Sequence, residues 1–362
     1  MATSKLRLRN LWLQLHKWIG ITLAILIVPV SVTGSALVWH DWLDAQVNPQ
    51  RHAAMGAAAL PPSAYERAAL QALEPGERIA TIALPRGGEG AVQVTLTRQA
   101  EQGRRPARAW IFLDPRDGRV IERAGLGEGL VRVLHVLHGS LMVPGVGRQI
   151  VGWIGVAMLI SSLSGIWLWW PSVGGLRRGL RWRRQDRTSA NLHHTAGFWV
   201  ALPLAMLSFT GVWISFPAFF GAVSGAPAQG GGSPPFPVAE SRLGADSALA
   251  SARRANSGAP VSIAWPTDRS ADWTMRFAGG EGPAEVKVAD ASGSATAVPP
   301  RPETIARTMR RWHDGDGMGP LFQTIIFIGG LVPALLAVTG IMMWLRGRSR
   351  RAEAARRTAP AR

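Results

Sequence analysis

Cysteine is absent from the 362-residue chain. Structural disulfides, cysteine-ligated iron–sulfur clusters and the C-x-x-C-H attachment of c-type haem are therefore excluded. Acidic residues are few, with 23 Asp and Glu against 40 Lys and Arg, and tyrosine occurs once. A cofactor held by histidine without a covalent link is compatible with this composition, because imidazole is a good iron ligand.

Charged residues of either sign are missing from four long stretches: Trp18–His40, Gln149–Leu176, Thr195–Ala239 and Gly317–Leu345. Each contains at least the ~20 mostly apolar residues needed to cross ~30 Å of hydrocarbon. The second half of the third stretch, SGAPAQGGGSPPFP, is rich in Gly and Pro and predicts a loop. We therefore predict a membrane protein with four spanning helices. The first is too long in its apolar part to be a cleaved signal peptide.

The net charge of +17 is distributed unevenly along the chain. Six arginines lie in the connector 172–191 and seven in the tail from Arg346, whereas residues 41–130 are neutral. This bias predicts that both termini and the connector lie in the cytoplasm, and that the two large loops lie outside. We therefore attribute the positive charge to the orientation of the chain in the membrane and to contact with anionic membrane lipid. We expect no nucleic-acid partner.

The first and third spans share a pattern. LQLHKWIGI and NLHHTAGFW both contain L-H-x-x-x-G, and a Thr-Gly dipeptide follows each of the two histidines at the same offset. The second and fourth spans also correspond, because His138 precedes Gly165 by the same offset as His313 precedes Gly340. Matching offsets in both pairs of spans predict two related halves, linked by a pseudo-twofold axis along the membrane normal.

That axis pairs His16 with His193 near the cytoplasmic face, and His138 with His313 near the external face. Two imidazoles from facing helices are the arrangement that holds a low-spin haem b, so we predict two haems with these four iron ligands. Six glycines are interpreted as sites where a flat macrocycle approaches the backbone, although small residues in spans also serve helix packing. They are Gly20, Gly197, Gly34, Gly211, Gly165 and Gly340.

Three other histidines are possible substitutes as ligands. His194 adjoins His193, and adjacent helical positions differ by about 100°, so the sequence leaves open which of the two faces inward. His135 lies one turn before His138, on the same helix face, where it could ligate, contact substrate or bind a separate metal. Its counterpart in the second half is Arg310. His40 ends the first span and is interpreted as a possible interfacial residue.

The two loops each predict a small α+β module. Residues 61–125 contain a short helical pattern followed by strand patterns, and residues 243–292 repeat this theme. Within IFLDPRDGRVIE, the glycine supplies the positive φ of a turn between two strands. Neither loop contains paired carboxylates, a Ser/His arrangement or metal-ligand spacing, so the catalytic residues stay unknown at this level.

Several of these segments together resemble the PepSY-associated transmembrane proteins of the bacterial inner membrane: QLHKWIGI, SVTGSALVW, HGSLMVPGVGRQIVGWIGVAMLISSLSGIWLWWP, NLHHTAGFW and LDPRDGRV. The expected fold is a four-transmembrane-helix bundle with internal duplication and two α+β, PepSY-like periplasmic modules. The expected segments are helix 1 at 11–40, module 1 at 41–134, helix 2 with a periplasmic extension at 135–171, a basic loop at 172–191, helix 3 at 192–220, module 2 at 221–312, helix 4 at 313–346 and a basic tail at 347–362.

The resemblance implies b-type haems and electron transfer across the inner membrane to a periplasmic ferric-siderophore, hence a ferric-chelate oxidoreductase that releases iron. No G-x-G-x-x-G follows a predicted strand, so the electron donor would be a cytoplasmic partner or a quinol. Two alternatives are a non-catalytic PepSY-containing membrane regulator or sensor, and a small-solute transporter. The spans hold no Asp, Glu or Lys for ion coupling, which argues against the transporter.

Overall fold

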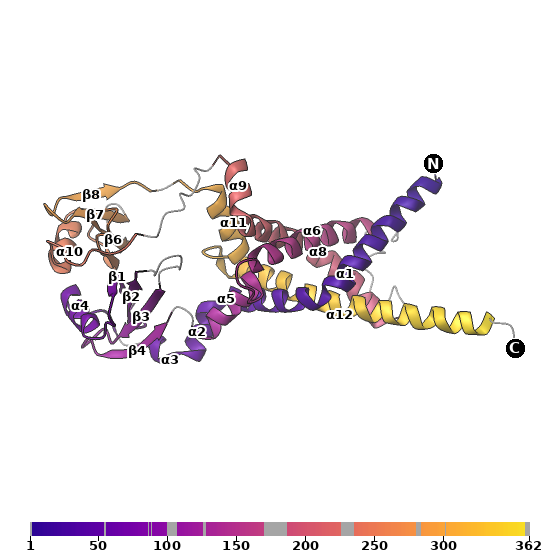
Figure 1. Cartoon of the computed structure of the whole chain (residues 1–362), viewed down its shortest axis with the longest axis horizontal. Coiled ribbons are helices and arrows are strands. Elements are labelled where there is room, and N and C mark those ends of the chain that lie inside the picture. The colour runs from indigo at the N-terminus through magenta and orange to yellow at the C-terminus, as the bar shows by residue number, and fades with distance from the viewer. Residues whose placement is uncertain are drawn as a thin grey trace. The chain divides into compact units, whose positions relative to one another are not determined.

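The structure, a computed structural model, divides the chain into two compact units (Figure 1). Unit 1 comprises residues 1–40, 133–228 and 303–362, and unit 2 comprises 41–132 and 229–302. Most of the predicted basic connector lies outside the described residues, as does the end of the tail. The described residues are 2–53, 56–85, 87, 89–99, 107–125, 128–169, 187–225, 235–279, 284–300 and 302–358.

Among its described residues, unit 1 contains four helices that are long and apolar enough to cross a membrane, as predicted. They are α1 (Ala2–Val38), α6 (Gly147–Trp169), α8 (Thr188–Ser215) and α12 (Gly319–Thr358). Large apolar side chains point outward from them: Ile25, Leu202 and Leu321 are 80%, 77% and 76% exposed. Such a surface is unfavourable in water and suits hydrocarbon, so the chain is a multi-pass membrane protein.

The four helices form a bundle in which α1 and α8 each pack against both α6 and α12 (Figure 1). The helices that correspond in the predicted duplication, α1 with α8 and α6 with α12, therefore lie across the bundle from each other. Side chains on α1 and α8 can meet at its centre. The short helix α9 (Pro217–Val223) follows α8.

His138 and His313 lie on short helices that precede their spans, α5 (Leu130–Ser140) and α11 (Ile305–Asp314). The sequence interpretation had placed each of them at the start of a continuous helix. Left-handed residues separate the short helix from the span in both halves: Leu141 and Met142 have φ of 50° and 58°, and Gly315 has φ of 75°. An α-helix cannot continue through residues in this conformation.

In the described part of unit 2, eight strands form one antiparallel sheet in the order β4-β3-β2-β1-β5-β6-β7-β8. The α+β modules are confirmed, and they share this sheet because β1 pairs with β5, with Ile82 opposite Ile263. The strands are β1 (Glu77–Ala83), β2 (Val92–Arg98), β3 (Ala107–Leu113), β4 (Val120–Gly125), β5 (Ala259–Ala264), β6 (Asp272–Ala278), β7 (Glu285–Ala289) and β8 (Ala295–Val298).

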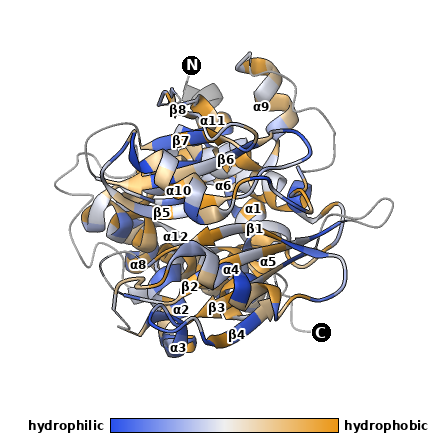
Figure 2. Ribbon diagram, turned by 90° about the vertical axis from the view of Figure 1, so that its left-hand side faces the viewer, coloured by the Kyte–Doolittle hydropathy of each residue, from blue (hydrophilic) through white to orange (hydrophobic). Residues whose placement is uncertain are grey.

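Two helices, α4 (Pro62–Leu70) and α10 (Ala245–Arg253), lie over the strands (Figure 2). They contribute Tyr65, Ala248 and others to one apolar core that also includes Trp273 and Met275 from the sheet. Asp246 of α10 accepts hydrogen bonds from the backbone nitrogen and the hydroxyl of a serine in the first turn of α4, at 2.9 and 2.6 Å. The two modules are thus joined through both the sheet and the helices. Unit 2 also includes α3 (Pro49–His52) and most of α2 (His40–Val47).

Candidate functional site

Two histidines face each other across one end of the helix bundle. His16 of α1 and His193 of α8 have ring centroids 6.4 Å apart, with ring planes at 89°. The ring of His194 lies 6.3 Å from that of His193. The structure therefore places His193 opposite His16, which is the point that the sequence left open.

A second pair lies at the other end of the bundle. His138 of α5 and His313 of α11 have ring centroids 5.9 Å apart, with planes at 38°. The structure thus brings together the same histidines that the duplicated pattern pairs. A third close pair, His40 and His135, has centroids 6.2 Å apart.

The spacing of these pairs can be compared with that of two imidazoles that share one metal ion. A metal–nitrogen bond of about 2.0–2.1 Å, added on both sides to the ~1.1 Å between ring nitrogen and ring centre, separates the two centres by roughly 6.2–6.4 Å. The measured separations of 6.4 and 5.9 Å are close to this value. The ring-centre separation of each pair is therefore close to that of two imidazoles that ligate one metal ion.

The hydrogen bonds of the first pair leave Nε2 of each ring available as a ligand. Nδ1 of His16 lies 3.1 Å from the carbonyl oxygen of Ser161, which can only accept, so Nδ1 carries the proton. Nδ1 of His193 lies 3.0 Å from the hydroxyl of Thr339. That hydroxyl donates to the carbonyl of Leu335 at 2.8 Å, so its oxygen accepts from His193.

The second pair repeats this arrangement. Nδ1 of His138 donates to the carbonyl oxygen of Val30 at 2.9 Å. Nδ1 of His313 lies 3.1 Å from the carbonyl oxygen of Leu207 and 3.0 Å from the hydroxyl of Thr210. Histidines that ligate metals almost always donate their second ring nitrogen to such an acceptor, which fixes the tautomer and the ring orientation. All four histidines meet this requirement.

Each of the four rings also rests against a Ser-Gly or Thr-Gly dipeptide on a neighbouring helix. The contact is closest at Gly34, where an added Cβ would stand 2.6 Å from Cε1 of His138. The corresponding distances to Cε1 of the opposing histidine are 3.1 Å at Gly211, 3.4 Å at Gly165 and 3.5 Å at Gly340. Sequence reasoning assigned these glycines to contact with a macrocycle and missed the imidazole. The signal was present, since Ser or Thr precedes all four of them.

The other two predicted glycines have more open surroundings. A Cβ at Gly20 would meet no atom of the described residues within 4 Å, and one at Gly197 would meet a leucine methyl group at 3.8 Å. These positions leave space beside the His16/His193 pair.

Two buried hydroxyls lack partners among the described residues. Ser31 and Ser208 are 5% and 6% exposed, and their Oγ atoms make no hydrogen bond there. They occupy equivalent positions in the two halves, at the same offset from His16 and from His193. An unsatisfied buried hydroxyl costs about 1–3 kcal/mol, so its occurrence at both equivalent positions is compatible with a polar group other than protein inside the bundle.

The number of ligands that each pair supplies can be compared with the needs of a bare metal ion and of a haem. Within the described residues, no group of three or more His, Cys, Asp or Glu side chains could hold a metal ion. A haem iron already has four porphyrin nitrogens and needs only two axial ligands from the protein. His16 with His193, and His138 with His313, fit that need.

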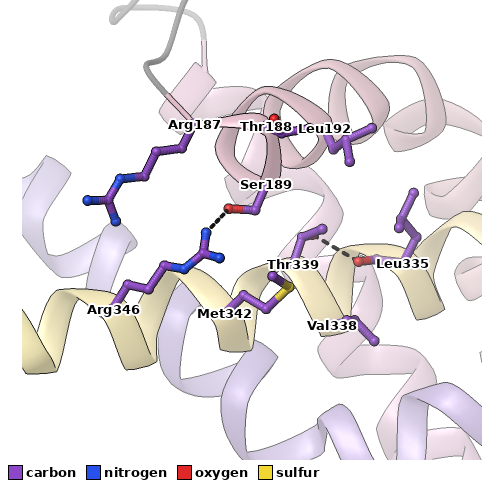
Figure 3. Close-up of a pocket in the computed structure, with 9 residues that line it drawn as sticks. All are labelled: Arg187, Thr188, Ser189, Leu192, Leu335, Val338, Thr339, Met342 and Arg346. Atoms are coloured by element: carbon purple, nitrogen blue, oxygen red, sulfur yellow. Dashed lines mark hydrogen bonds between the residues drawn. The ribbon is translucent and has the colours of Figure 1, made fainter.

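A groove between α8 and α12 lies close to the first pair (Figure 3). Its volume is about 710 Å³, and Thr339, which hydrogen-bonds to His193, is one of its lining residues. Arg346 donates a hydrogen bond to Ser189 Oγ at 3.0 Å across it. Apolar side chains make up most of the remaining lining: Leu192, Leu335, Val338 and Met342.

The chain was compared with families of known proteins, and one family matches most of its length. A sequence model described as the PepSY-associated TM region matches residues 13–347. No curated protein matches the chain.

Proposed function

The chain belongs to the PepSY-associated TM region family, and we propose that it is a di-haem b reductase of the bacterial inner membrane that delivers electrons to a periplasmic ferric-siderophore. The observation that carries the proposal is the presence of two facing histidine pairs, at 6.4 and 5.9 Å, at opposite ends of the bundle. In the proposed orientation both termini are cytoplasmic, because the arginine-rich segments adjoin the His16/His193 end.

The two pairs span most of the membrane. His138 contacts Gly34, which lies on the same helix as His16 and five turns further along it. At about 1.5 Å per residue, positions 16 and 34 are about 27 Å apart along α1, against ~30 Å of hydrocarbon. One pair therefore lies near each face, as a path for electrons across the bilayer requires.

In this function the protein holds the two haems and fixes the orientation of their histidine ligands. Haem b, bound at each pair, would supply one-electron chemistry whose potential depends on the axial ligands. The four imidazoles present Nε2, and the carbonyls and hydroxyls that accept from Nδ1 keep each ring in that tautomer. The apolar helices around them exclude water and lower the local dielectric.

The substrate assignment rests on family membership and on the chemistry of iron. Hard oxygen donors suit Fe(III) better than Fe(II), so one-electron reduction weakens a ferric-siderophore and releases its iron. Electrons would enter at the His16/His193 end from a cytoplasmic partner or a quinol. They would leave at the His138/His313 end.

Absorption spectroscopy of the purified full-length protein tests the proposal. We expect a b-type α-band in the reduced-minus-oxidised spectrum, and loss of about half of it in His16→Ala and in His138→Ala, because each variant loses one of two haems. His52→Ala is the matched control, since His52 lies in unit 2 and pairs with Asp44 at 2.7 Å. Absence of the band, or a full band in both variants, would overturn the haem assignment.

Stopped-flow mixing with ferric chelates then tests the reductase. Reoxidation of the reduced protein by ferric-siderophores, with Fe(II) appearing at the same rate, is the expected result. A haem that stays reduced in the presence of every ferric chelate would favour a regulator over a reductase.

A further inference from the structure

His40 and His135 form a third imidazole pair that the two haem sites do not use. Their ring centroids are 6.2 Å apart, within the range set by the other two pairs. Nδ1 of His40 donates to the carbonyl oxygen of Leu37 at 3.0 Å, so Nε2 is the nitrogen that can ligate a metal.

This pair is not a product of the internal duplication. The equivalent positions in the second half hold Pro217 and Arg310, neither of which is a metal ligand. A feature that only one half carries is not required by the bundle architecture. It distinguishes the His138/His313 end from the other end, and His135 lies one helical turn before His138.

The surroundings of the pair differ from those of the haem ligands. His40 bonds to a carbonyl only three residues earlier in the chain, whereas each of the four proposed haem ligands bonds to a helix that is distant in sequence. His135 is exposed and His40 half-buried. The carboxylate of Asp314 interacts electrostatically with His135 and His138, and it also forms an ion pair with Arg310 at 3.6 Å.

We propose that His40 and His135 form an exchangeable site for a divalent transition-metal ion, which in this protein is Fe(II) leaving the reduced chelate. Imidazole suits Fe(II), Zn(II) and other borderline ions, and hard oxygen chelators compete for Fe(II) poorly. Two side-chain ligands, with water completing the coordination, hold such an ion weakly. The site therefore passes iron on and does not store it.

The identity of the ion as iron rests on the proposed function, whereas the metal site does not. No electron moves in the binding step. The one-electron reduction of Fe(III) comes first, and Fe(II) then exchanges chelate oxygens for the two imidazoles. Zn(II), which is redox-inert, should bind the same pair.

Anaerobic equilibrium dialysis of the full-length protein in detergent, against Fe(II) and in parallel against Zn(II), tests the site. We expect about one exchangeable ion per chain in the wild type and in the control His52→Ala. Affinity should fall by at least about tenfold in His40→Ala and in His135→Ala. The loss of binding free energy in the double variant should be smaller than the sum of the two single losses, because both ligands serve one ion.

The haem spectrum, recorded on the same samples, distinguishes a failure of the metal-site proposal from a failure of the proposed reductase function. A full α-band in His40→Ala and His135→Ala is expected, and it also shows that both variants are folded. Wild-type metal affinity in both variants, or loss of the α-band in either, would overturn the proposal. If the wild type holds no haem and still binds Zn(II) through this pair, the metal site stands and the reductase does not.

Discussion

Replacing Gly34 by alanine should displace His138 from its position opposite His313. The added methyl carbon would stand 2.6 Å from Cε1 and 2.9 Å from Nδ1 of the ring. Carbon atoms pack best at about 3.5–4.0 Å, so the ring or its helix must move by roughly 0.9 Å. The ring cannot turn aside freely, because its Nδ1 is hydrogen-bonded to the carbonyl of Val30 on the same helix as the glycine.

The size of the effect follows from this crowding. Overpacking of this kind costs about 1–3 kcal/mol, and a shift near ~1 Å is enough to spoil a metal–nitrogen bond. We expect Gly34→Ala to lose most of the haem held by the His138/His313 pair and to keep the haem of the His16/His193 pair. The α-band should fall by about half.

The other glycines supply a graded series. Alanine at Gly211 would meet its histidine at 3.1 Å, so a smaller loss is expected. At Gly165 and Gly340 the distances are 3.4 and 3.5 Å, which is ordinary contact. Gly347→Ala in α12 is the matched control, because a Cβ there meets no atom of the described residues within 4 Å and the variant shares the gain of up to about 1 kcal/mol in helix propensity without the clash.

The assay is the haem-to-protein ratio of purified full-length variants, together with thermal unfolding. The expected order of haem loss is Gly34→Ala, then Gly211→Ala, with the other three near the wild type. The reasoning is refuted if Gly34→Ala binds two haems, or if Gly165→Ala loses more haem than Gly34→Ala.

Three further outcomes are expected. Thr339→Val should weaken haem retention at His193 by about 10–100-fold, measured by haem transfer to apomyoglobin, whereas Thr339→Ser keeps the acceptor and should behave as wild type; equal retention in both would contradict the role of the hydroxyl. Hydrogen bonds from Arg116 hold the pKa of Asp114 at about 2. The stability they contribute is therefore present above the usual carboxyl pKa and is lost as pH falls towards 2. In Arg116→Ala, acid unfolding of the sheet, followed by circular dichroism, should move up towards pH ~4, and an unchanged midpoint would exclude this contribution. Asp246→Asn should destabilise unit 2 by about 1–3 kcal/mol, seen in thermal unfolding, because two hydrogen bonds to α4 lose their charged acceptor; a wild-type melting temperature would show that this link is unimportant.

The bundle and the histidine pairs could be anticipated because both depend on spacing along the chain. Four uncharged stretches predict four spans whatever their neighbours are. Equal offsets from His16 and from His193 place residues at equivalent heights on related helices, so the partner of each histidine follows from the repeat. The α+β modules were also predictable, from alternating strand patterns and the turn at Gly118, whose φ is 74°.

Helix rotation and close contacts could not be read from the chain. His193 and His194 are adjacent in sequence, and only the packing of α8 against α12 turns His193 towards His16. The function of the glycines depends on which side chain a neighbouring helix brings to them. In the structure that side chain is an imidazole; the Ser or Thr before each glycine marks the position but does not identify this neighbour.

Two structural features arise from geometry that residue type does not specify. Leu141 and Met142 adopt left-handed backbone angles, although neither residue type favours them, and the break between α5 and α6 depends on these angles. The joining of the two modules depends on β1 and β5, the edge strands at which they meet, and only three residue pairs define their register. Alternating patterns predict each strand but not its partner in another module.

The internal duplication relates the two histidines within each pair and does not relate one end of the bundle to the other, so a direction of electron flow must come from chemical differences between the two ends. Both ends have a histidine pair with the same hydrogen-bonding plan. A groove of about 710 Å³ lined by Arg187 and Arg346 lies at the His16/His193 end, and the half-buried His40 and the exposed His135 lie at the other end. In the proposed function, the unduplicated histidines set the exit end because they bind the reduced metal and draw the reaction forward.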